Sequence, residues 1–117
     1  IVVHLGLIKG SRVRQVAQLR DFVEREIPPG ERLVVAGDFN DWGERLDGPM
    51  AAFGLQRAAT PHAASSRLNT FPSRFPLFAM DRIYTRGLRC QGSSVPRGTT
   101  WARMSDHLPL VAEPMLD

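Results

Sequence analysis

The chain has 117 residues, enough for one small hydrophobic core but too few for two ordinary domains. Its 15 basic and 12 acidic residues give a net charge of +3, and the basic residues are scattered, which excludes a nucleic-acid-binding tail but suits a phosphate-bearing partner. A single cysteine excludes an internal disulfide and a cysteine-based zinc site. No apolar stretch approaches the roughly 20 residues of a transmembrane helix, and a cytoplasmic location is weakly favoured.

The N-terminal segment predicts a strand, a helix and a second strand. Ile1–Leu5 is apolar apart from His4, and Leu33–Ala36 is apolar throughout, as in buried strands. Between them, apolar residues recur with a helical period up to Ile27, and we expect Ser11 to cap this helix. Because a helical crossover makes two strands parallel, their carboxyl ends should emerge at one edge of a sheet.

The rest of the chain predicts shorter elements. In chain order we expect a helix over Leu46–Phe53, a strand over Leu55–Ala58, a surface loop over Ala59–Pro76, a hairpin of Ala79–Tyr84 with Leu88–Val95, a loop over Gly98–Arg103 and a strand over Leu108–Ala112.

Polar motifs occur where these strands end or begin. They are Gly37-Asp38-Phe39-Asn40-Asp41, Met80-Asp81-Arg82-Ile83-Tyr84 and Ser105-Asp106-His107-Leu108-Pro109-Leu110. Asp and Asn oxygens are ligands that Mg²⁺ and Mn²⁺ prefer, and an Asp distant in sequence commonly orients a His. The first motif alone also fits a strand end followed by an Asn-containing turn. The ordered set favours a metal-dependent phosphodiesterase site.

The order of these motifs after His4 resembles the endonuclease/exonuclease/phosphatase superfamily, from His4 to Leu110. Members are four-layered α/β sandwiches of roughly double this length. The resemblance therefore implies an α/β fold in which residues 1–117 form the C-terminal half of the domain, a mixed β-sheet with helices on one face. The Glu that binds the principal metal in the family belongs to the other half, so no residue here is assigned to it.

The resemblance also implies roles for individual residues. The implied catalytic residues are His4, Asp38, Asn40, Asp81 and His107, and the implied ligands of Mg²⁺ or Mn²⁺ are Asp106, Asp38 and Asn40. Asp38 would polarise the attacking water, and Asn40 would hold the water or the phosphate. His107 would contact a phosphate oxygen or act as acid or base, with Asp81 accepting its other N–H, and His4 would contact the phosphate.

Several of these residues also fit purely structural roles. Asp81 also fits a surface ion pair with a neighbouring arginine, Asp106 a turn or capping residue, and His4 an interior histidine. Asp41 is interpreted as a surface or capping residue, and its adjacency to Asn40 leaves a supporting role in the site open. Phe71, Trp101 and Arg103 are expected to bind substrate, although aromatic residues beside strands usually serve the core.

The implied function is metal-dependent hydrolysis of a phosphodiester or phosphomonoester, with a nucleic acid or a phospholipid head group as substrate. Val2-Val3-His4 stands where many members have Asn-Thr-His, and residues 5–36 contain no tyrosine, which weighs against an abasic-site endonuclease. The alternative is a non-catalytic half-sandwich or binding module that lacks the metal-ligand Glu. Either way, the uncovered sheet face favours a homodimer of the fragment.

Overall fold

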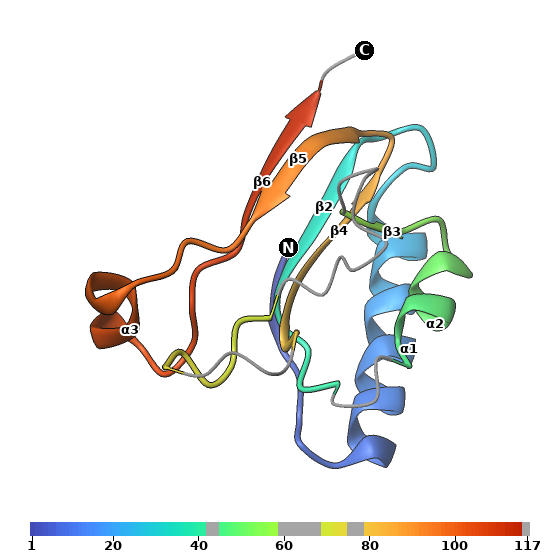
Figure 1. Ribbon diagram of the computed structural model, residues 1–117. Helices are drawn as coiled ribbons and strands as arrows, with labels where there is room; N and C mark the ends of the chain where they lie inside the picture. Colours follow the sequence, from blue (N-terminus) through green and yellow to red (C-terminus); the bar gives the residue numbers. More distant parts are fainter. Residues whose placement is uncertain (42–44, 59–68, 75–78, 116–117) are drawn as a thin grey trace.

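The computed structural model describes residues 1–41, 45–58, 69–74 and 79–115, and these form an α/β fold (Figure 1). The elements are β1 (Val2–His4), α1 (Lys9–Glu26), β2 (Leu33–Asp38), α2 (Asp47–Ala51), β3 (Gln56–Arg57), β4 (Asp81–Arg86), β5 (Arg89–Ser94), α3 (Thr99–Met104) and β6 (Val111–Met115). Of the helices in the described ranges, none combines the length and apolar character needed to cross a bilayer.

The main sheet has the strand order β1-β2-β4-β3. β1 and β2 are parallel, as the helical crossover predicts, whereas β4 is antiparallel to both β2 and β3. The mixed sheet is thus confirmed. Its register places His4 opposite Asp38 and Asp38 opposite Asp81, so these residues form a row across one end of the sheet.

Helices α1 and α2 cover one face of this sheet (Figure 1). Along β2, Leu33 and Val35 are buried against them while Val34 points to the other face. The core between helices and sheet contains Val16, Val23, Leu33, Val35, Phe39, Leu46, Met50, Phe53, Leu55 and Tyr84. Apolar burial on this side of the sheet holds the strand ends in place.

The opposite face of the sheet is partly open. Val2 is 87% exposed and Val34 38% exposed, while Ala36 and Ile83 are half-buried. The register puts these side chains on the same face as Asp38 and Asp81. The row of polar residues, His4, Asp38 and Asp81, therefore lies at one end of a partly open apolar face of the sheet.

Two details of the first helix differ from the prediction. α1 begins at Lys9, with Ile8 at the N-cap position and no side-chain capping hydrogen bond, so the prediction that Ser11 caps it is wrong. Side chains one turn further along secure the preceding loop instead. Gln15 accepts the N–H of Gly6 at 2.8 Å, and Arg12 donates to the carbonyl of Leu7.

The C-terminal elements pair differently from the prediction. β4 and β5 do not form a hairpin with each other, because β5 pairs antiparallel with β6 in a separate two-stranded sheet. This small sheet lies on the side of the main sheet away from α1 and α2 (Figure 1). The expected loop over Gly98–Arg103 contains α3, and the last strand begins at Val111 instead of Leu108. Most of the loop expected over Ala59–Pro76 lies outside the described residues.

Candidate active site

At the polar end of the main sheet, the backbones of the neighbouring strands β1 and β2 approach each other closely. Gly37 has a φ of 146°, and a Cβ there would lie 1.8 Å from the carbonyl oxygen of Val3, so only glycine permits this approach. The N–H of Leu5 donates to the carbonyl of Asp38 at 2.8 Å, and that of Phe39 to the carbonyl of Met80 at 2.9 Å. These bonds fix the ends of the strands on either side of Asp38.

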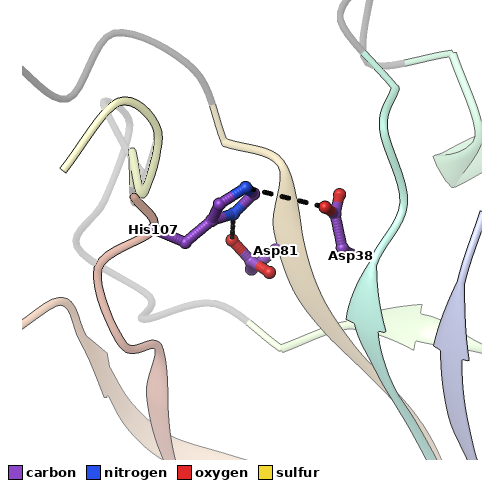
Figure 2. A group of neighbouring side chains, drawn as sticks. All are labelled: Asp38, Asp81 and His107. Atoms are coloured by element: carbon purple, nitrogen blue, oxygen red, sulfur yellow. Dashed lines mark hydrogen bonds and ion pairs between the residues drawn. The ribbon is translucent and has the colours of Figure 1, made fainter. Parts of the chain in front are cut away.

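Asp81 and His107 form a hydrogen-bonded pair (Figure 2). Nδ1 of His107 lies 2.5 Å from Oδ2 of Asp81, and both side chains are about one-quarter exposed, at 24%. Thr70 donates its hydroxyl to the same oxygen at 2.7 Å, and its carbonyl accepts the N–H of Leu108 at 2.7 Å. Thr70 thus holds Asp81 directly and the backbone of Leu108, the residue after His107. The alternative of a surface ion pair between Asp81 and an arginine is wrong.

The other imidazole nitrogen of His107 faces Asp38 across the end of the sheet (Figure 2). Nε2 lies 3.7 Å from Oδ2 of Asp38. Burial lowers the pKa of His107, but the hydrogen bond with Asp81 and the charges of Asp81, Asp38 and Asp106 outweigh it, and the pKa is raised above its ordinary value. The ring therefore stays protonated to higher pH than a free histidine.

Asp38 and Asn40 are fixed by a tight turn after β2. The backbone N–H of Asn40 donates to Oδ1 of Asp38 at 2.9 Å, and the Asn40 side-chain nitrogen donates to the carbonyl of Leu5 at 2.6 Å. Asn40 has a φ of 47°, a left-handed conformation that asparagine tolerates better than most residues. With Oδ1 engaged in the turn, Oδ2 of Asp38 faces the two histidines.

His4 stands at the rim of the site. Its Nε2 lies 3.6 Å from Oδ2 of Asp38, and its side chain is 78% exposed. The alternative of an interior histidine is therefore wrong. His4 and His107 approach the same carboxylate oxygen from β1 and from the segment after α3, respectively.

A divalent cation fits part of this arrangement. One ligand atom each from Asp38, Asp81 and His107 lie within 4.8 Å of one another. The hydrogen bond between Asp81 and His107 engages Oδ2 of Asp81 and Nδ1 of His107, whereas Asp38 accepts one backbone N–H, that of Asn40, and keeps lone pairs for a cation. One or two carboxylates, completed by water and phosphate oxygens, is the usual environment of Mg²⁺ in phosphate-processing sites. Asp106 is exposed and outside this group, so its role as a ligand stays a prediction.

The predicted substrate-binding residues lie on the side of His107 formed by α3 and residues 69–74. The Phe71 ring is tilted against the imidazole of His107, with centroids 4.9 Å apart. Trp101, which is 39% exposed, lines a cavity of about 290 Å³ together with His107. Arg103 is exposed in the last turn of α3. Phe71 and Trp101 thus lie beside His107, and the role of Arg103 stays a prediction.

A buried ion pair behind the site was missed by sequence reasoning. Asp41 and Arg82 are 2% and 1% exposed, so the interpretation of Asp41 as a surface residue is wrong, whereas the capping interpretation agrees with its acceptance of the Leu46 N–H at 2.7 Å, just before α2. Arg82 donates to Oδ2 of Asp41 at 2.8 Å and to its carbonyl at 2.9 Å. Burial raises the pKa of Asp41, but hydrogen bonds from Arg82, Arg45 and Leu46 outweigh it and the pKa is lowered. The sequence contains a signal for this ion pair, because the oppositely charged residues Asp41 and Arg82 directly follow Asn40 and Asp81 in the two motifs.

Thr70 was also missed, and the sequence offers no signal for it. The residue lies in a stretch rich in Ser, Thr, Pro and Arg that indicates only a loop. Its contact with Asp81 depends on the fold bringing residues 69–74 against residues 106–108.

Comparisons with known proteins agree with this architecture. The model of the Endonuclease/Exonuclease/phosphatase family matches residues 3–107. The uncharacterized protein YbhP of Escherichia coli is 42% identical over 113 residues, which are 95% of this chain and 44% of that protein. A functionally unknown conserved protein from Enterococcus faecalis superposes with a TM-score of 0.76 at 23% identity, covering 99% of this chain and 49% of that one. For a mannosyl-6-phosphatase from Bacteroides thetaiotaomicron the TM-score is 0.72 at 18% identity, covering 98% and 50%. The chain thus spans about half the length of the proteins it matches.

Proposed function

The chain belongs to the endonuclease/exonuclease/phosphatase family, and on that premise we propose that it carries the acid–base half of an active site that hydrolyses phosphoesters with Mg²⁺ or Mn²⁺. The observation that carries this proposal is the Asp81–His107 pair, which presents Nε2 of His107 toward Asp38. Because the chain spans about half of its relatives, we assign the activity to the full-length domain that contains it.

Phosphoester hydrolysis requires an oriented water, neutralised charge on the phosphate oxygens and a proton for the leaving oxygen. Protonated His107, held by Asp81, donates its Nε2 proton to the leaving oxygen as the bond between that oxygen and phosphorus breaks. Asp38 accepts a proton from the attacking water through Oδ2, and exposed His4 binds the phosphate from the other side. Each role uses an atom that the hydrogen bonds described above leave available.

A divalent cation would be held by the Asp38 carboxylate through Oδ1, which keeps a lone pair beside the N–H of Asn40 and leaves Oδ2 for the water, with Asn40 and Asp106 as further oxygen donors. When bound, it supplies positive charge to the oxygens of the phosphate. The side-chain nitrogen of Asn40 is committed to the carbonyl of Leu5, so the amide would meet a ligand through its oxygen. Oxygen donors favour Mg²⁺ or Mn²⁺ over Zn²⁺.

The substrate class that we propose is a phosphodiester or a phosphomonoester, such as those of nucleic acids and phospholipid head groups. The mannosyl-6-phosphatase among the structural neighbours supports keeping phosphomonoesters in this class, although its low identity bears on the fold alone. Phe71 and Trp101 offer ring faces beside His107 for the organic part of such a substrate.

The proposal is tested with the full-length protein, assayed on p-nitrophenyl phosphate and bis(p-nitrophenyl) phosphate. We expect at least one of them to be hydrolysed, the activity to vanish with EDTA, and Mg²⁺ or Mn²⁺ to restore it where Zn²⁺ does not. Gln18→Ala on the exposed side of α1 serves as a control variant. Restoration by Zn²⁺ alone would overturn the oxygen-ligand assignment. A folded protein without any turnover would favour the non-catalytic module.

A further inference from the structure

A cavity of about 540 Å³ lies between residues 73–74 and the segment that leads into α3. Its lining includes two arginines, Arg74 and Arg97, and two hydroxyl residues, Ser73 and Thr99. We call it the arginine cavity. The cavity is large enough to admit a phosphate group and part of the molecule that carries it.

Among the described residues, no acidic side chain lines the arginine cavity. Arg74 and Arg97 are both exposed, and within the described ranges of the chain neither guanidinium contacts a carboxylate. By contrast, Arg20, Arg25 and Arg82 each pair with an acidic side chain. Guanidinium groups bind phosphate oxygens in bidentate fashion, and the Thr99 hydroxyl can donate a further hydrogen bond, whereas the Ser73 hydroxyl already donates to the carbonyl of Ala102 at 3.2 Å. The two guanidinium groups therefore favour an anion with several oxygens, such as phosphate.

The arginine cavity is joined to the candidate active site through a shared wall. The N–H of Ser73 donates to the carbonyl of Asp106 at 2.8 Å, which ties its lining to the residue before His107. Leu108 lines the arginine cavity and also the cavity that contains Trp101 and His107. A further hollow of about 310 Å³, lined by Arg74 and Asp106 among others, lies along the same wall. A molecule bound at His107 thus has an adjacent path to the arginines.

We propose that the arginine cavity binds a second phosphate group of the substrate whose first phosphate is hydrolysed at Asp38 and His107. This inference rests on the proposed function and narrows it to phosphoesters with two phosphate groups on one molecule. The second group is either a phosphate on a small sugar or the neighbouring phosphate of a nucleotide chain. Both present the same anion to Arg74 and Arg97.

The kinetic test compares Arg74→Gln, Arg97→Gln and their double variant in the full-length protein. Arg14→Gln, which removes the same charge from the exposed side of α1, is the matched control. The substrates are a hexose monophosphate and bisphosphate, and a thymidine dinucleotide with and without a terminal phosphate. We expect the double variant to raise KM for a two-phosphate substrate at least ~10-fold, since two charge-assisted contacts are lost, with kcat unchanged.

The one-phosphate member of each pair should respond no more than it does to Arg14→Gln. An effect confined to the hexose pair identifies a small bisphosphate, and one confined to the dinucleotide pair identifies a nucleotide chain. Equal KM changes for one-phosphate and two-phosphate members, or no change in either pair, would overturn the proposal.

A binding measurement separates this proposal from the proposed function. Inorganic phosphate is titrated into the full-length protein in EDTA while the side-chain Nε signals of Arg74 and Arg97 are followed by NMR. We expect these signals to shift and saturate, and the phosphate affinity to fall in the double variant but not in Arg14→Gln. Shifts without turnover of any phosphoester support the arginine cavity and contradict the proposed function. Turnover without such shifts overturns the arginine cavity alone.

Discussion

The two ring nitrogens of His107 have separate partners, and this division defines the chemistry of the site. Nδ1 is held by Asp81, whereas Nε2 faces Asp38 at a distance too long for a good hydrogen bond. Nε2 is therefore available to a ligand between the two side chains. Such an arrangement fixes the ring orientation and raises its basicity before any substrate arrives.

The raised pKa of His107 leads to a prediction about Asp81. In Asp81→Asn the ring loses both the hydrogen bond to a carboxylate and the nearest negative charge, so its pKa should fall. The pKa is measured from the Cε1 proton of His107 by NMR. An unchanged His107 pKa in Asp81→Asn would contradict the pairing.

The same shift affects stability with a defined sign. Because the pKa of His107 is higher in the folded chain than in the unfolded chain, protonated His107 stabilises the fold fully below the unfolded pKa. This contribution is lost as the pH rises through the folded pKa. The free energy of unfolding should fall across that interval in the wild type, and the fall should be smaller in His107→Gln.

At the scale of elements, the Arg82–Asp41 ion pair connects β4 to the turn that follows β2. Asp81 and Arg82 are adjacent in β4 and point to opposite faces, so one reaches the site and the other the buried side. In the same way, the buried residue Asp41 directly follows Asn40, a residue of the candidate site. The ion pair thus fixes the two segments that supply the carboxylates of the site.

Removing one partner of this ion pair should be costly. We expect Arg82→Met to lower the free energy of unfolding by about 3–5 kcal/mol, because Asp41 is left as an unpaired buried charge. The double variant Arg82→Met with Asp41→Leu should recover much of that loss. Arg20→Met, in an exposed pair with Glu24, is the control and should change stability by less than about 1 kcal/mol. Urea denaturation checks these values, and a small effect of Arg82→Met would contradict the buried pairing.

At the scale of the whole molecule, the two faces of the main sheet differ in their covering. Helices α1 and α2 bury one face, whereas Val2 and Val34 are exposed on the other. An apolar sheet face is unfavourable in water unless something packs on it.

The 117-residue chain by itself should therefore associate through this face. Sedimentation at increasing concentration should show self-association, and Val34→Lys should abolish it by placing a charge in the contact. Val13→Lys, at a position of α1 that is 55% exposed, should leave it intact. A chain that stays monomeric and well folded at high concentration would contradict the packing argument.

Sequence patterns predicted the parts of the fold that depend on local periodicity. The apolar runs of β1 and β2 and the helical period of α1 are long enough to be read, and they placed His4 beside Asp38 because parallel strand ends share an edge. The pairing of Asp81 with His107 was implied by the family resemblance alone, because β4 is antiparallel to β2 and His107 lies between α3 and β6. The predictions for the short C-terminal elements were wrong because those segments are too short to show a period. The six residues of α3 are too few to show a period, and the Gly87 turn is equally compatible with a hairpin and with the observed crossing to a second sheet. Asp41 was misread because its partner lies 41 residues away.

The most direct test of the central claim is a double-mutant cycle on Asp81 and His107 in the full-length protein, with phosphoester hydrolysis in Mg²⁺ as the readout. If the two residues act as one acid–base unit, Asp81→Ala and His107→Ala should each reduce kcat at least ~10²-fold, and the double variant should lose little more than the worse single variant. Circular dichroism checks that all three variants fold. Losses that multiply in the double variant, or activity within a few-fold of wild type in either single variant, would contradict the account.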